Sequence, residues 1–248
     1  MPSRLTEGPW SPDAQHGGAP AALFGGEIER VLAEEAMSLA RLTVDLLRPV
    51  PLIPMRLVTR VVRPGKRVQV VDLHLEAEGQ MVARATGLGT RVAKHDVPFG
   101  KPVDETLAAP EDASPANWFD RPGALATDGM EVRSVDGDFN QPGPAKAWFR
   151  MRVPVTSANP PTSIETTCAA ADFGNGASNW DPQFSWLFIN PELTIHFARP
   201  PAGEWILLDS VTTAHDSGTG LGESRLFDMN GLFGRSAQSL LVEPFGGR

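Results

Sequence analysis

The sequence predicts an α+β protein made of two related units, each with one helix and a run of antiparallel strands. Two observations lead to this fold class. First, the pattern changes twice along the chain between apolar residues at helical spacing and alternating apolar and polar residues. Second, residues 42–50 match residues 193–201 without a gap, sharing Leu, Thr, Arg and Pro at a constant offset of 151.

The first unit begins with a predicted helix at residues 19–36, where Ala22, Ile28, Leu32 and Ala36 recur at helical spacing. Alternating, β-branched segments separated by proline and glycine turns follow this helix. They predict four antiparallel strands, at residues 42–47, 55–62, 67–77 and 81–92.

The second unit follows a segment, residues 94–128, that loses the alternation and contains five prolines, as a linker or surface crossover does. We therefore divide the chain into a first unit at 1–93, this linker, and a second unit at 129–248. Because one apolar helix can cover one face of each sheet, the two sheets are free to pair edge to edge. The second unit is predicted to hold a helix at 163–174 and strands at 130–135, 147–153, 192–198, 204–215, 222–228 and 233–242.

Composition excludes several classes of protein. With Cys168 as its one cysteine, the chain can form neither an intrachain disulfide nor a zinc site made of cysteines. The start of the chain is too polar for a signal peptide, and the sequence holds no apolar run near the roughly 20 residues of a membrane helix. A formal charge of −8 disfavours nucleic acid as a partner. We expect a cytoplasmic protein without membrane insertion.

The comparison of the two units also suggests which of them carries chemistry. A looser match of residues 78–86 with 230–238, at an offset of 152, places Thr86 opposite Gln238. Extending the first offset back into the helices places Ala21 opposite Asp172. Only the second unit then has both an acid and an amide at these positions.

Four segments, DAQHGGAPAALF, RLTVDLLRPVP, ELTIHFARPPAGEWILLDS and SAQSLLV, resemble in this order the TesB-like (type II) acyl-CoA thioesterases. The resemblance spans nearly the whole chain. It implies a double hotdog fold, in which each of two fused units wraps an antiparallel sheet around a central helix. It also implies hydrolysis of acyl-CoA to a free acid and coenzyme A, without a metal or redox cofactor, by a homo-oligomer of two or more copies.

The resemblance further implies a catalytic trio in the second unit. Asp172 matches an aspartate on the central helix, and Gln238 matches a glutamine on the last strand. Asn190 falls where the family has a threonine or similar polar residue, and Thr194 is the competing candidate. Asp172 would activate a water that Gln238 and Asn190 position. Burial among alanine and phenylalanine would make this carboxylate a better base than an exposed one.

Two further groups of residues are candidates for substrate contacts. One group could offer an imidazole or backbone N–H groups beside the reacting carbonyl: His16, Gly17, Gly18 and Gly174. The other surrounds a Pro-Gly turn and could meet the phosphates of coenzyme A, although charges at such turns are often only solvated: Arg63, Lys66 and Arg67.

Other functional interpretations of the same residues stay open. A non-catalytic acyl-CoA or fatty-acyl binding protein would have the same fold. A hotdog hydratase would pair an aspartate with a histidine, but no histidine follows Asp172 before His196. The five histidines show no metal-ligand spacing, so no metal site is predicted. Cys168 is expected to be a buried, unreactive thiol, and the glycine-rich residues 218–222 a turn or bulge.

Overall fold

Residues 1–93, all described by the structure, form the helix and four strands that the sequence predicts for the first unit. Helix α1 (Gly18–Ala33) follows a short 3-10 turn, η1 (Arg4–Thr6). The helix ends before the predicted Ala36, whose positive φ of 52° is incompatible with a right-handed helix. The first strand therefore begins at residue 37. The strands are β1 (Met37–Leu46), β2 (Arg56–Arg63), β3 (Val68–Ala77) and β4 (Gln80–Arg91).

The sequence analysis missed two strands, β5 (Ser114–Pro115) within the predicted linker and β8 (Trp186–Ile189) in the second unit. The helix predicted at 163–174 ends earlier, as α2 (Ser163–Ala171), and a short helix, α3 (Gly174–Ala177), follows it. The glycine-rich residues 218–222 form a turn only at their start, because a strand begins at residue 219. The remaining strands are β6 (Met130–Asp136), β7 (Ala145–Met151), β9 (Glu192–Phe197), β10 (Ile206–Ala214), β11 (Thr219–Asp228) and β12 (Gly231–Pro244).

The computed structural model describes residues 1–96, 107–116, 124–137, 139–156, 159–179, 181 and 185–244. Part of the predicted linker therefore lies outside the described residues. The part that is described contains η2 (Pro110–Asp112), strand β5 and a π-helical turn, η3 (Leu125–Gly129). Strand β5 pairs with β6, and Leu125 is 2% exposed. These residues pack against the protein and do not form a free connection.

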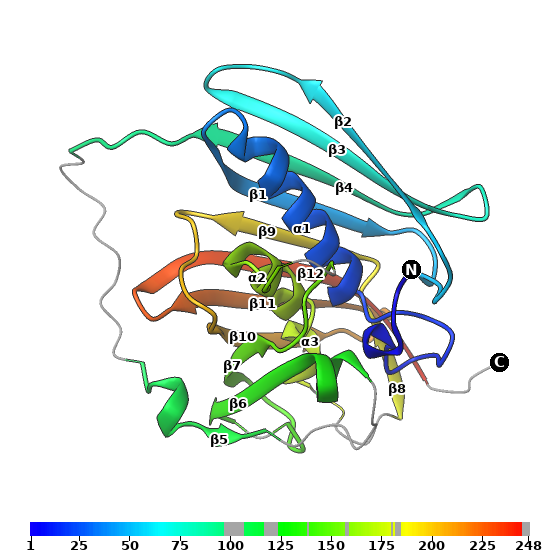
Figure 1. The fold of residues 1–248 in the computed structure, drawn as a ribbon. Coiled ribbons are helices and arrows are strands. Elements are labelled where there is room, and N and C mark those ends of the chain that lie inside the picture. The colour runs from blue at the N-terminus through cyan, green and yellow to red at the C-terminus, as the bar shows by residue number, and fades with distance from the viewer. Residues whose placement is uncertain are drawn as a thin grey trace.

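The described strands make one twelve-stranded sheet, in which the two units pair edge to edge as predicted (Figure 1). The strand order is β2-β3-β4-β1-β9-β12-β11-β10-β7-β6-β5, with β8 paired to β12 outside this path. The seam is the antiparallel pair β1–β9, in which Thr43 lies opposite Thr194. These two residues are also equivalent in the internal repeat, since they are 151 positions apart. A pair of equivalent residues that face each other lies on a pseudo-two-fold axis, so this axis passes through the seam. Pairing the edges in this way leaves neither unit with an open edge at the centre.

The pairing registers of the two units agree residue by residue at the offset of 151. Leu46 pairs with Ala83 in the first unit, and Phe197 pairs with Gly234 in the second. The β-bulge after Leu75 recurs after Leu226. The register corrects one sequence alignment. At the offset of 151, Thr86 of the first unit is equivalent to residue 237 of the second, and Gly87 is equivalent to Gln238.

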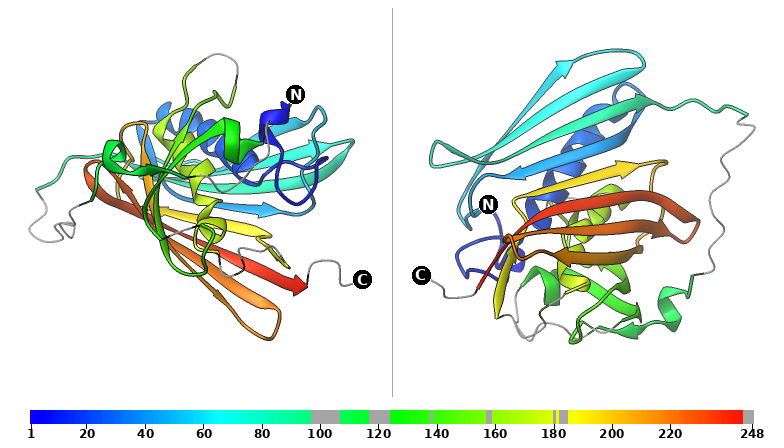
Figure 2. Two further views of the ribbon diagram at one scale, coloured as in Figure 1. Left: turned by 90° about the horizontal axis from the view of Figure 1, so that it is seen from below. Right: turned by 180° about the vertical axis from the view of Figure 1, so that it is seen from behind.

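Both helical segments cover the same face of the sheet, as the view from behind shows (Figure 2). Helices α1 and α2 run antiparallel and touch through small residues. A Cβ atom at Gly25 would lie 2.5 Å from the Cys168 Sγ atom, so the backbones approach closely. Helix α2 begins with a capping box in which Thr162 and Glu165 exchange side-chain and backbone hydrogen bonds. The helix ends at Asp172, which it thereby fixes against α1. The pairing of Ala21 with Asp172 stays a prediction.

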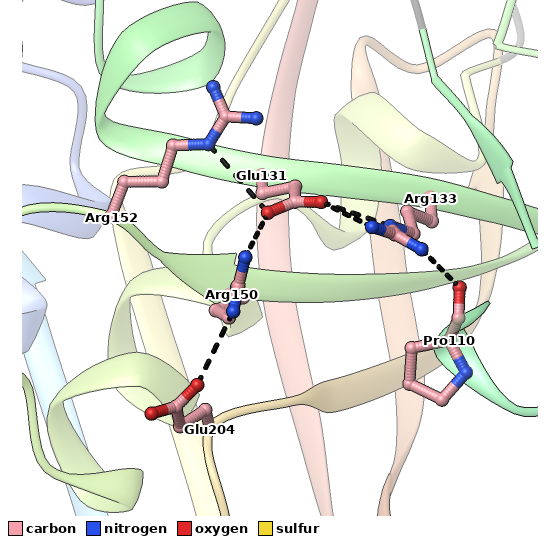
Figure 3. Close-up of polar contacts among 6 residues, drawn as sticks. All are labelled: Pro110, Glu131, Arg133, Arg150, Arg152 and Glu204. Atoms are coloured by element: carbon pink, nitrogen blue, oxygen red, sulfur yellow. Dashed lines mark hydrogen bonds and ion pairs between the residues drawn. The ribbon is translucent and has the colours of Figure 1, made fainter.

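An ion-pair cluster ties the outer strands of the second unit together (Figure 3). Glu131 on β6 accepts hydrogen bonds from Arg150 on β7, at 2.5 Å, and from Arg133, at 2.9 Å. Arg133 also donates to the backbone oxygen of Pro110, at 2.9 Å, and so attaches η2 to the sheet. Burial alone would raise the pKa of Glu131, but the hydrogen bonds from both arginines outweigh it and hold the pKa below its ordinary value.

Candidate active site

A cavity of about 750 Å³ lies between the two units at the end of strand β1. Its walls come from four segments: residues between 8 and 17, residues 46–50, residues between 172 and 176, and residues 187–191. Trp10, Phe173 and Phe188 contribute aromatic rings to the lining, and Trp10 meets Phe188 edge to face at 5.1 Å between ring centroids. A mainly apolar cavity with a few polar groups is the usual form of a small-molecule site.

Asp172 is the acid in this cavity, and donors hold both of its carboxylate oxygens. Its position as the C-terminal cap of α2 leaves the residue 4% exposed. Asn190 donates from Nδ2 to Oδ1 at 2.6 Å, and the His16 Nδ1 atom lies 2.8 Å from Oδ2. Burying a carboxylate is costly unless it is paired, so these contacts explain how a charge is kept at this helix end.

Gln238 lies behind Asp172, away from the cavity. It is 1% exposed and is not among the residues that line the cavity. Its Nε2 atom donates to the Asp172 backbone oxygen at 3.2 Å and lies 3.4 Å from Oδ1. Its Oε1 atom accepts from the backbone N–H of Asn175 at 3.2 Å. In this arrangement Gln238 holds the end of α2, and its contact with the attacking water stays a prediction.

The two candidates for the third polar position lie on different faces of the sheet. Asn190 follows β8 and lines the cavity beside Asp172. Thr194 belongs to β9, where Leu193 and Ile195 face the buried helix side. Because neighbouring residues of a strand point to opposite faces, Thr194 is on the other face, with its hydroxyl 3.4 Å from that of Thr43. Thr194 therefore does not reach Asp172.

His16 belongs to the site through contacts that its sequence position did not reveal. Its ring stacks on Phe173 at 4.1 Å between centroids. At 2.8 Å, the Nδ1 atom and the carboxylate oxygen of Asp172 must share one proton, because two lone pairs would repel each other. The backbone N–H of Gly18 lies 3.1 Å from the same nitrogen and can donate to it only when Nδ1 carries no proton, so this contact competes with Nδ1–H donation to Asp172. The imidazole is thus fixed between the start of α1 and the acid.

The candidate glycines allow backbone segments to approach the acid closely. A Cβ atom at Gly17 would lie 2.8 Å from Oδ2 and 2.9 Å from Oδ1 of Asp172. At Gly18 it would lie 2.8 Å from the backbone oxygen of Ala169, and at Gly174 it would lie 2.7 Å from the Ser224 hydroxyl. Gly17 is therefore the one whose missing side chain makes room for the carboxylate.

The basic turn does not belong to this site. The cavity lies at the end of β1, beside the start of β4, as the pairing of Leu46 with Ala83 shows. The turn between β2 and β3 lies at the other end of the same strands, where the backbone of Arg67 meets that of Arg91. A ten-residue strand is about 30 Å long. Three basic residues of this turn are absent from the cavity lining, and the expectation that they meet the phosphates of coenzyme A stays a prediction: Arg63, Lys66 and Arg67.

Cys168 is fully buried between the two helices, and burial raises the pKa of its thiol. Sequence reasoning missed Trp10, Phe188 and Arg48, which line the cavity from segments that no local pattern connects with Asp172. Asn175 could have been found, because it follows Asp172 in the same helical stretch. Among the described residues, no group of His, Cys, Asp or Glu is arranged to hold a metal ion. In the same part of the chain, no helix has the length and apolarity that crossing a membrane requires.

Comparisons with known proteins match both units. The family model described as the acyl-CoA thioesterase C-terminal domain matches residues 105–242, and the one described as the N-terminal domain matches residues 6–91. A search of the curated proteins found no match to the sequence.

Solved structures resemble the chain over nearly its whole length. A hotdog-fold protein of unknown function from Alicyclobacillus acidocaldarius has a TM-score of 0.76 at 17% identity, covering 98% of this chain and 91% of its own. A putative thioesterase II from Thermobifida fusca has a TM-score of 0.74 at 16% identity, with coverages of 98% and 90%. The acyl-CoA thioesterase II TesB2 from Mycobacterium marinum has a TM-score of 0.65 at 15% identity, with coverages of 92% and 91%. The predicted double hotdog fold is confirmed.

Proposed function

Because this chain belongs to the acyl-CoA thioesterase family, whose domain models match both of its units, we propose that Asp172 activates a water molecule that hydrolyses an acyl-CoA thioester. The products are a free acid and coenzyme A. The observation that carries the proposal is a buried carboxylate in the wall of a mainly apolar cavity, with a donor on each of its oxygens.

Asp172 acts as the general base. An ionised carboxylate has about four lone-pair positions; Asn190 and Gln238 donate to Oδ1, at 2.6 and 3.4 Å, and His16 meets Oδ2. Room therefore remains for a water to donate a hydrogen bond to the acid. As the water oxygen attacks the thioester carbonyl carbon, its proton passes to the carboxylate. Collapse of the tetrahedral intermediate breaks the carbon–sulfur bond, and the proton goes to the departing thiolate.

The neighbouring side chains orient the acid. Asn190 fixes Oδ1, and its second N–H can donate to the water or to the developing oxyanion, a role worth about 3 to 4 kcal/mol in other enzymes. His16 fixes Oδ2 through the shared proton. Gln238 acts as a positioning residue, since it holds the backbone at the end of α2.

The test is thiol release from a panel of coenzyme A thioesters with short, medium, long and aromatic acyl groups. Asp172→Asn keeps the shape of the side chain and removes the base, so we expect kcat to fall at least about 100-fold, with a melting temperature close to that of the wild type. Gln238→Leu should lower kcat less. A fully active, folded Asp172→Asn protein would refute the assignment of the base.

The same panel separates hydrolysis from binding alone. A non-catalytic acyl-CoA binding protein would be stabilised against heating by the thioester without releasing thiol. Stabilisation that is equal in the wild type and in Asp172→Asn, together with no turnover in either, would favour the binding protein.

One observation favours a second candidate, hydration of an enoyl thioester. The sequence has no histidine between Asp172 and His196, but the fold brings His16 from the first unit to 2.8 Å from the acid. Such a pair could act on an unsaturated acyl group as acid and base. Loss of the enoyl absorbance without release of thiol would identify this reaction. Association into a homo-oligomer stays a prediction, and sedimentation of the full chain would test it.

A further inference from the structure

Arg48 and Arg199 occupy equivalent places in the two units. The backbone N–H of Arg48 donates to the Val82 oxygen at 3.2 Å, and that of Arg199 donates to the Phe233 oxygen at 3.4 Å. Both pairs differ by 151 positions. Each arginine therefore follows its strand at the equivalent position of its hotdog unit.

Arg199 has a buried partner. Asp228 is 0% exposed and accepts hydrogen bonds from Nη1 of Arg199, at 2.6 Å, and from Nη2, at 2.7 Å. Burial alone would raise the pKa of Asp228, but the bonds from Arg199 and from the backbone outweigh it and lower the pKa. The charge of this arginine is thus neutralised inside the second unit.

Arg48 has no such partner. The residue equivalent to Asp228 is Ala77, since the turns Ala77–Gln80 and Asp228–Gly231 follow the same offset. Among the described residues, no hydrogen bond or ion pair involves the Arg48 guanidinium. The side chain is exposed and lines the cavity that holds Asp172. The first unit has kept the arginine and replaced the acid.

Arg48 is also the one permanent cation among the residues lining this cavity; the other ionisable groups there are Asp172 and His16. A net charge of −8 on the chain would repel an anionic ligand from most of the surface. Because Arg48 is exposed and Asp172 is buried, the arginine marks the outer end of the cavity and the acid the inner end.

We propose that Arg48 is an anion-recognition residue that binds a phosphate of the thioester's carrier arm while the thioester bond lies at Asp172. The inference rests on the proposed thioester hydrolysis and adds the group that holds the substrate at its far end. Guanidinium suits this role because its planar N–H groups can pair with two phosphate oxygens. The apolar lining between the two ends has no charge to hold a phosphate elsewhere.

The experiment compares three substrates with the same acyl group, carried by coenzyme A, by 4′-phosphopantetheine and by pantetheine, which has no phosphate. Arg48→Gln should raise KM about fivefold to tenfold for the phosphate-bearing substrates, as expected for one charge-assisted pair. For the pantetheine thioester, KM should stay within about twofold. The effect should shrink at high salt.

Arg56→Gln is the matched control, because Arg56 lies at the same end of the sheet, is exposed, and does not line the cavity. It should leave all three KM values unchanged. A loss that is equal for all three substrates, or no loss in Arg48→Gln, would overturn the proposal. A KM increase in Arg48→Gln for succinyl-pantetheine but not for butyryl-pantetheine would also overturn it, because it would show that Arg48 binds a carboxylate of the acyl group.

Calorimetric titration with coenzyme A itself gives a readout that needs no turnover. Arg48→Gln should weaken coenzyme A binding about fivefold to tenfold. If the wild type binds coenzyme A in this Arg48-dependent way but hydrolyses nothing, the proposed hydrolysis fails and the phosphate contact stands. If turnover is normal and binding does not depend on Arg48, the phosphate contact alone fails.

Discussion

Gly17→Ala tests whether the approach of α1 to the acid matters for catalysis. Gly17 has a φ of −58°, so alanine can adopt its backbone conformation without strain. The added Cβ atom, however, would lie 2.8 Å from one carboxylate oxygen of Asp172 and 2.9 Å from the other. Ordinary contact begins near 3.4 Å. Either the carboxylate or the start of the helix must therefore move by about half an ångström.

A displacement of this size should lower kcat by roughly tenfold to 100-fold, because misplacing a catalytic group by about 1 Å can cost 100-fold. Overpacking should also destabilise the protein by about 1 to 3 kcal/mol. Thiol release and urea unfolding would measure the two effects separately. KM should change less than kcat, since the other close contact in the cavity wall, 2.9 Å to the Leu46 Cδ1 atom, is with the flexible end of a side chain.

Gly25→Ala is the control, because it introduces the same methyl group on the same helix against Cys168, away from Asp172. It should lower stability while leaving kcat within a few-fold of the wild type. If Gly17→Ala is folded and turns over within twofold of the wild type, the carboxylate does not need the position described here. If both variants lose activity equally, the effect comes from helix packing.

Three further predictions follow from the structure. Because folding lowers the pKa of Glu131, its ionised carboxylate stabilises the folded protein fully above the unfolded pKa, and this stabilisation is lost as the pH falls through the folded pKa. Glu131→Gln should therefore lower the free energy of unfolding in urea by about 1 kcal/mol at neutral pH. An equal loss in acid would contradict this. Ala77→Asp should neutralise Arg48 and weaken coenzyme A binding relative to Ala77→Asn, and no difference between the two would refute the equivalence of Ala77 with the acid of the second unit. Cys168 should react with a thiol reagent only on unfolding, and fast labelling of the native protein would show that the two helices separate.

The fold could be predicted because its signals are local and occur twice. Alternation along the strands and helical spacing before them set the elements, and the repeated Leu-Thr and Arg-Pro pairs related the units. The misplaced register of Thr86 arose at the turns, where Gly79 ends one turn while Gly231 begins the next strand. Matching glycine with glycine shifted the alignment by one residue. Strand β8 was missed because four apolar residues carry no period of their own.

The site was predictable only in part, because its contacts cross between distant segments. Asp172 stood out as a charge among alanines, and Asn190 was found only through the family resemblance. His16 lies in the other unit, and nothing in its neighbourhood indicates the acid that it meets. The burial of Gln238 behind Asp172 depends on the packing of α3 against β10 and β11 and on the hydrogen bond from the Asn175 backbone, which sequence spacing does not specify.

The division of the cavity wall between the two units has a consequence for how such a chain can be altered. Either half, produced alone, would display an incomplete chamber, so mixing separately made halves should restore turnover only when they reassociate along the seam. The first unit supplies an imidazole, a guanidinium and much of the enclosure to the cavity that holds Asp172 of the second unit. The unit without Asp172 should therefore be as necessary to the proposed reaction as the unit that carries it.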